Sequence, residues 1–80
     1  MSKLTRHDEH LGSFWWDLSG DEPIMVASIM YRKRLGVWQW RYGRPSGLLL
    51  SDSEERREVA ENIIGDFLRA DGWEVTLAPA

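Results

Sequence analysis

Four segments of the chain have hydrophobic patterns that are typical of β-strands: residues 14–18, 24–33, 37–42 and 73–77. In the first segment, Phe14, Trp16 and Leu18 share one face at the period of a strand. The second segment is rich in Ile, Val and Met, which strands favour, and the last alternates cleanly between apolar and polar positions. The pattern therefore predicts a sheet of three or four strands.

Residues 24–33 and 37–42 predict a β-hairpin. Gly36 lies in the turn between them, where a glycine can take positive φ. In the returning strand, Trp38, Trp40 and Tyr42 point to one side of the sheet. Which side meets a helix stays open, because a register shift of one residue moves every side chain to the other face.

A helix is predicted over residues 52–70. Ser51 is the candidate N-cap, and Glu54 three residues later completes a capping box. Two apolar rows run along one side of this helix: Val59, Ile63 and Phe67, and beside them Ala60, Ile64 and Leu68. Gly65 costs a helix about 1 kcal/mol relative to alanine, and a close contact with the sheet would explain it. Gly72 is placed just past the end of the helix.

These elements follow one another in the order β-β-β-α-β. We expect an α+β fold, with a small antiparallel three- to four-stranded sheet and one helix packed on one face. A chain of 80 residues fits one domain, placed at residues 13–80 after a flexible N-terminus of residues 1–12. The other face of the sheet is left uncovered, so large apolar side chains there need a partner or a dimer mate.

The chain contains five tryptophans and no cysteine. Without cysteine there is no disulfide and no thiolate metal site, which fits a reducing compartment. The longest nearly apolar run, residues 24–31, is too short to span a bilayer. We therefore expect a cytoplasmic protein, in the host bacterial cell if the chain is phage-encoded. Five indoles are more than a small core buries easily, so we expect part of the aromatic surface to form an interface.

Charge is distributed unevenly along the chain. Residues 23–51 carry five basic residues and no acid, whereas residues 52–80 carry eight acids and three arginines. Each pole can steer a partner of opposite charge. The acidic part is either the solvated face of a helix or a surface that mimics a phosphate backbone.

Two histidines, His7 and His10, flank two acids near the N-terminus. A structural metal site needs three or four ligands on a fixed frame, whereas these residues lie in the expected flexible segment. The serines show no nucleophile-elbow pattern, and the acids of the helix lie beside arginines, as on a solvated face. We therefore expect no metal, no cofactor and no enzymatic activity.

The best functional candidate is the hairpin with its exit loop, where basic and aromatic residues are interleaved. The candidate partner-binding residues are Arg32, Lys33, Arg34, Trp38, Trp40, Arg41 and Arg44. Tryptophan, tyrosine and arginine dominate many protein interfaces, and the same combination suits phosphate contact with base stacking. The alternative is that the aromatic residues form the core against the helix, with the charged tip protecting the sheet edge.

The stretch Gly36-Val37-Trp38-Gln39-Trp40-Arg41 is similar to a hairpin with a G-x-W-x-W-R pattern in small bacterial domains of unknown function. In general character, as a short, cysteine-free α/β chain, the protein resembles the small phage-encoded anti-CRISPR inhibitors. The resemblance implies a non-enzymatic inhibitor that binds a Cas effector complex, type I favoured, and blocks target DNA binding. It transfers no individual residue.

Our first hypothesis is therefore an inhibitor that binds a protein partner, as a monomer or homodimer and away from membranes. The alternative is a small nucleic-acid-binding accessory or regulatory module that uses the same hairpin, although the net charge of −3 weighs against it. A third hypothesis is a dimer that buries the uncovered sheet face against itself. A steep loss of affinity with added salt would identify the nucleic-acid binder.

Overall fold

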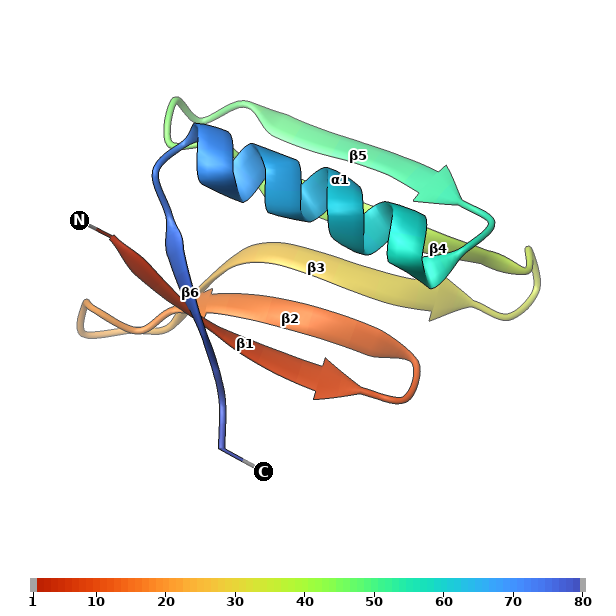
Figure 1. The fold of residues 1–80 in the computed structure, drawn as a ribbon, viewed down its shortest axis with the longest axis horizontal. Helices are drawn as coiled ribbons and strands as arrows, with labels where there is room; N and C mark the ends of the chain where they lie inside the picture. Colours follow the sequence, from red (N-terminus) through yellow and green to blue (C-terminus); the bar gives the residue numbers. More distant parts are fainter. Residues whose placement is uncertain (1, 80) are drawn as a thin grey trace.

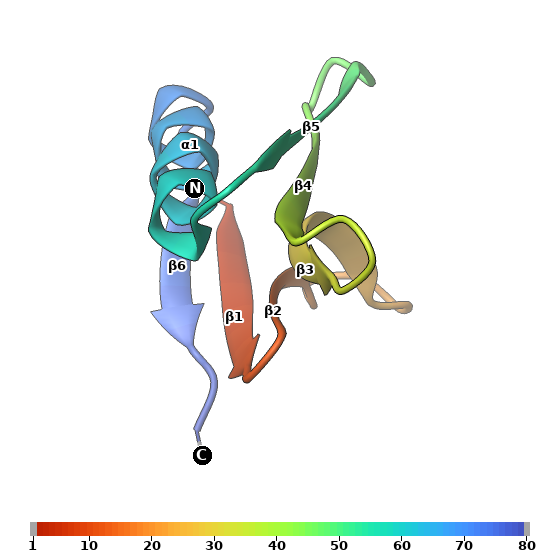
Figure 2. The ribbon, with the colours of Figure 1, turned by 90° about the vertical axis from the view of Figure 1, so that its right-hand side faces the viewer.

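The structure is a computed structural model that describes residues 2–79, and it contains one helix and a six-stranded sheet. The strands are β1 (Lys3–Glu9), β2 (Gly12–Asp17), β3 (Ile24–Arg32), β4 (Val37–Gly43), β5 (Leu49–Glu54) and β6 (Glu74–Leu77). The helix α1 (Arg57–Ala70) lies between β5 and β6 in the sequence and packs on one face of the sheet (Figures 1 and 2).

The strands are arranged in the order β5-β4-β3-β2-β1-β6. Strands β1 to β5 form an antiparallel meander, and β6 pairs with β1 in parallel. The α+β class and the single helix on one face are confirmed. The prediction of a three- or four-stranded antiparallel sheet is wrong in strand number and in the direction of β6, because α1 carries the chain back across the sheet before β6 begins.

Strand β1 occupies most of residues 1–12, which were expected to form a flexible N-terminus. Its sequence is polar because only Leu4 reaches the buried core. Arg6 points to the helix side, where its guanidinium pairs with the carboxylates of Asp8 and Glu61 at 2.7 and 3.1 Å and lies 4.9 Å from the Trp15 ring. Charged side chains that are held by ion pairs leave no hydrophobic pattern in the sequence.

Strand β5 replaces the first part of the expected helix. The capping box of Ser51 and Glu54 does not form, because both residues pair with β4 in the sheet. The helix starts instead at Arg57, after an N-cap at Arg56 without a side-chain cap. Its end agrees with the prediction, since Gly72 follows the C-cap with a φ of 78°.

One side of the sheet, the helix face, forms the core with α1. Its buried residues are Leu4, Trp15, Ala27, Ile29, Trp40 and Tyr42. They pack with Ala60, Ile64 and Leu68, which follow one another every four residues along the helix. Of the two predicted apolar rows, this one is fully buried, while the row of Val59, Ile63 and Phe67 lies at the margin. Truncating Ile64 to alanine would cost about 2–5 kcal/mol.

The start of the helix is held by Arg57. Its guanidinium donates to three backbone carbonyl oxygens at 2.8–2.9 Å, those of Glu9, His10 and Gly12. It also donates to the Ser13 hydroxyl at 2.9 Å and pairs with the Glu61 carboxylate at 3.2 Å. This side chain therefore ties α1 to the turn between β1 and β2 and satisfies polar groups at the edge of the core.

The opposite side, here called the open face, is not covered by any element within residues 2–79 (Figure 2). The strand registers place on it the side chains of Thr5, His7, Phe14, Trp16, Met25, Ser28, Met30, Arg32, Gln39, Arg41 and Ser51. This arrangement agrees with the expectation that a single helix leaves one face uncovered.

Gly12 and Gly65 differ in how much space surrounds them. A Cβ at Gly12 would lie 2.7 Å from the backbone oxygen of Ile29 and 3.2 Å from the Phe14 ring. A Cβ at Gly65 would meet only the end of the Arg69 side chain, at 3.6 Å. The expected close contact between Gly65 and the sheet is therefore absent, and Gly12 has that role instead.

We predict that Gly12→Ala destabilises the protein by about 1–3 kcal/mol, because the methyl group collides with backbone. Gly65→Ala should raise the free energy of unfolding by up to about 1 kcal/mol through its better helix propensity. Urea unfolding followed by tryptophan fluorescence measures both changes. A destabilised Gly65→Ala variant would contradict the loose packing at that position.

Candidate functional site

The seven predicted partner-binding residues are divided between the two sides of the sheet. Arg32 and Arg41 lie on the open face, and Lys33 and Arg34 lie in the turn that joins β3 to β4. These four basic residues are exposed. The remaining three, Trp38, Trp40 and Arg44, lie on the helix side, where each contacts the core or the helix.

The two tryptophans of β4 are packing residues in this structure. Trp40 is 7% exposed, and its indole N–H donates to the Glu54 carboxylate at 3.2 Å. Trp38 is half-buried between the Tyr31 ring at 4.9 Å and the Arg57 guanidinium at 5.1 Å. Trp38 and Trp40 therefore lie as in the alternative interpretation of the sequence, in which the aromatic residues of the hairpin pack against the helix.

Arg44 belongs to a polar network at the end of the helix. Its guanidinium donates to the Asp71 carboxylate at 2.9 Å, and the Tyr42 hydroxyl donates to the same carboxylate. Burial, together with the neighbouring carboxylate, raises the pKa of Tyr42 to about 12. The hydrogen bonds from Tyr42 and Arg44 hold the pKa of Asp71 below its ordinary value of 3.8. The network fastens the end of α1 to β4.

The open face carries an apolar stretch that the sequence analysis did not assemble. Phe14 and Trp16 from β2 lie beside Met25 and Met30 from β3, whose exposed fractions are 48% and 40%. The two-residue period of a β-strand already predicted that Phe14 and Trp16 lie on the same face. Met25 joins them because the register shifts between Trp15 and Trp16, which leaves Val26 as an extra residue in β3.

Two shallow hollows run along this face between β3 and β4. The larger, of about 200 Å³, is lined by Met25, Ser28, Arg41 and Leu49 among others. The smaller, of about 80 Å³, adds Met30, Arg32 and Gln39. The flexible methionine side chains that line these hollows can adapt to varied apolar partners. Arg32 and Arg41 carry permanent positive charge beside them.

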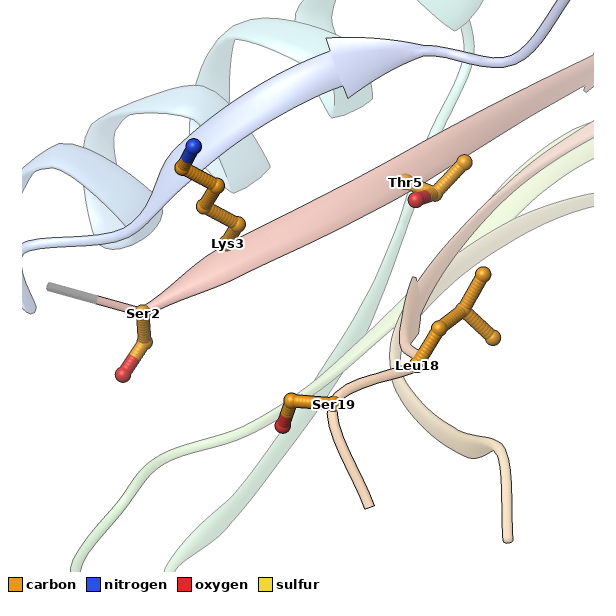
Figure 3. A pocket seen from close by; sticks show the side chains of 5 residues that line it. All are labelled: Ser2, Lys3, Thr5, Leu18 and Ser19. Carbon is orange, nitrogen blue, oxygen red and sulfur yellow. The ribbon is translucent and has the colours of Figure 1, made fainter. Parts of the chain in front are cut away.

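The other hollows differ in the polar groups that line them, and one of about 290 Å³ on the helix side contains Arg6, Glu61 and Arg69. Figure 3 shows one of about 410 Å³, where Ser2, Lys3 and Thr5 lie near Leu18 and Ser19 at the end of β2. It supplies hydroxyls and one ammonium group, without a carboxylate or imidazole among its lining residues. His7 lies in a separate hollow with Glu9, Phe14 and Trp16 on the open face.

His10 lies in the turn after β1, where its carbonyl is bound by Arg57. Within residues 2–79, no three His, Cys, Asp or Glu side chains are arranged to hold a metal ion. In the same range no helix is long and apolar enough to cross a membrane.

Comparison with known proteins finds no matching family model, no significantly similar curated protein and no significantly similar solved structure.

The Asp71 network predicts a dependence of stability on pH. Because the pKa of Asp71 is lowered in the folded protein, its contribution is present above the ordinary value of 3.8 and is lost as pH falls through the folded pKa. Asp71→Asn should therefore be less stable at neutral pH but lose less stability on acidification. Urea unfolding across acidic pH measures this, with Glu55→Gln as a control at an exposed carboxylate that takes part in no ion pair within residues 2–79. Equal acid sensitivity of the Asp71→Asn variant and the natural chain would refute it.

Proposed function

We propose that this chain is a non-enzymatic inhibitor that binds a protein partner through the open face of its sheet. The observation that carries the proposal is an apolar stretch in which the exposed Met25 and Met30 lie beside the half-buried Phe14 and Trp16. Arg32 and Arg41 flank this stretch. Monomeric proteins rarely leave contiguous apolar area of this kind without a binding role. Aromatic, methionine and arginine side chains are also enriched in protein interfaces.

The charges on this face support an acidic partner surface. No acid within residues 2–79 forms an ion pair with Arg32 or Arg41, and Arg32 donates only to the amide oxygen of Gln39 at 2.8 Å. An arginine that pairs with no carboxylate of its own chain can form an ion pair with a carboxylate of a partner protein. The turn residues Lys33 and Arg34 extend the positive charge at the same end of β3.

The helix side of the molecule carries both exposed acids and exposed arginines, and Arg56 and Arg69 pair there with Glu58 and Asp66. Exposed carboxylates lie on and between β5 and α1: Asp52, Glu55, Glu58 and Asp66. A protein bound by its open face would direct these acids away from the partner, where they repel a phosphate backbone. This favours the specific form of the proposal, in which the chain acts as an anti-CRISPR protein, binds a type I Cas effector complex and blocks target DNA.

One observation favours the alternative, a nucleic-acid-binding accessory module. Phe14 and Trp16 stand on an open sheet face near exposed cations, and this combination can stack bases and contact phosphates. The chain's net charge of −3 works against affinity for a polyanion. We therefore keep the protein-binding function as the conclusion.

We predict that the tagged chain captures a type I effector subunit from a bacterial lysate with or without nuclease treatment. Met30→Glu and Arg41→Glu should each reduce capture about tenfold or more, because they place negative charge on the binding face. Arg56→Glu is the matched control, since it reverses an exposed charge on the helix side, where Arg56 pairs with Glu58, and adds an acid near the start of the helix, which the helix dipole favours. Recovery of nucleic acid alone, abolished by nuclease, would replace this function with the alternative.

A further inference from the structure

The open face of β3 is arranged symmetrically about Ser28. Ser28 pairs with Phe14 of β2, while Met25 pairs with Trp16 and Met30 pairs with Gly12. Positions 12, 14 and 16 are successive open-face positions of β2, so the two methionines lie one step to either side of Ser28. The extra residue Val26 produces this symmetry, because without it Met25 would point to the helix face.

Opposite charges lie at the two ends of this symmetric strand. Asp21 and Glu22 lie in the loop before β3, next to the Met25 end. Arg32, Lys33 and Arg34 lie at the Met30 end. All of them are exposed, and within residues 2–79 none takes part in an ion pair. Each end therefore carries charge that nothing in the described part of the chain neutralises.

We propose that a second copy of this chain covers the open face. A two-fold axis parallel to the sheet, across β3 at Ser28, sets the two β3 strands antiparallel and face to face. Met25 of one copy then lies over Met30 of the other, and the Asp21 and Glu22 end lies over the partner's basic end. Each contact occurs twice, which is the self-complementarity that a two-fold interface requires.

The face is large enough for such an interface. The principal extents of the molecule are 36 × 30 × 20 Å, and the sheet lies across its two longer axes (Figure 1). A standard interface covers about 800 Å² on each partner. Two sheets packed at about 10 Å would exclude water from Phe14, Trp16 and the two methionines.

The two-fold arrangement is electrostatically unfavourable at Arg41. It pairs with Ser28 across β3 and β4, so the axis passes close to it and brings the two copies of Arg41 together. Like charges repel across an interface. The second copy would occupy the same face as the proposed target protein. The inference rests on the proposed function only because the second copy and the target would compete for this face.

Analytical ultracentrifugation of the full chain across a range of concentrations tests the inference without any target. The natural chain should sediment as a dimer that dissociates on dilution. Glu22→Lys and Arg32→Glu should each weaken the dimer about tenfold, because each reverses a charge in two symmetric contacts. The double variant Glu22→Lys/Arg32→Glu should restore the dimer, since opposite charges again face each other. Arg56→Glu, on the helix side, should leave the dimer unchanged.

Arg41→Gln separates the two proposals. It should strengthen self-association by removing the like-charge contact, yet weaken capture of an effector subunit. A monomeric mass at every concentration, or a double variant no better than either single variant, would overturn the dimer. A monomeric chain that still captures an effector overturns the dimer and leaves the proposed function standing. A dimer that captures no effector supports this inference and overturns the function.

Discussion

One helix has to cover the apolar side of a six-stranded sheet, and this difference in width governs the rest of the structure. A helix with its side chains is about 10 Å wide, whereas six strands spaced by about 4.8 Å extend over about 24 Å. The helix therefore buries a narrow core around Ile29, Tyr42 and Ile64. At its margins, Arg57 and Asp71 satisfy polar groups that the helix does not cover.

The same constraint leaves the open face without any cover from the described part of the chain. Residues 2–79 build no second layer on that side, so within them the face is open to water or to a partner. The apolar stretch around Met25 and Met30 favours a partner, and the unpaired Arg32 and Arg41 favour an acidic one. Under both proposals, a second copy and a target protein would compete for this one surface, which would link self-association to the proposed inhibition.

Much of the local structure could be predicted because it depends on near neighbours in the sequence. The helical stripe of Ala60, Ile64 and Leu68 repeats at the helical period, and Gly36 and Gly72 take the positive φ expected of them. Strand β1 was not predicted as a strand, and for β5 only residues 48–50 were considered, as a buried connector or a brief strand extension. Most of their side chains are polar, apart from Leu4 in β1 and Leu49 and Leu50 in β5. Backbone pairing with β2 and β4 holds both strands, and local periodicity does not report such pairing.

The sequence by itself determined one α+β domain with an amphipathic helix, a central hairpin and a basic tip at Arg32, Lys33 and Arg34, because these follow from short-range periodicity and composition. Only the tertiary structure decided which face each side chain occupies. The register of β4 sends Trp38 and Trp40 toward the helix and Arg41 away from it, and one extra residue in β3 brings Met25 to the open face. Both outcomes depend on pairing between strands, where a shift of one residue exchanges the two faces of a sheet.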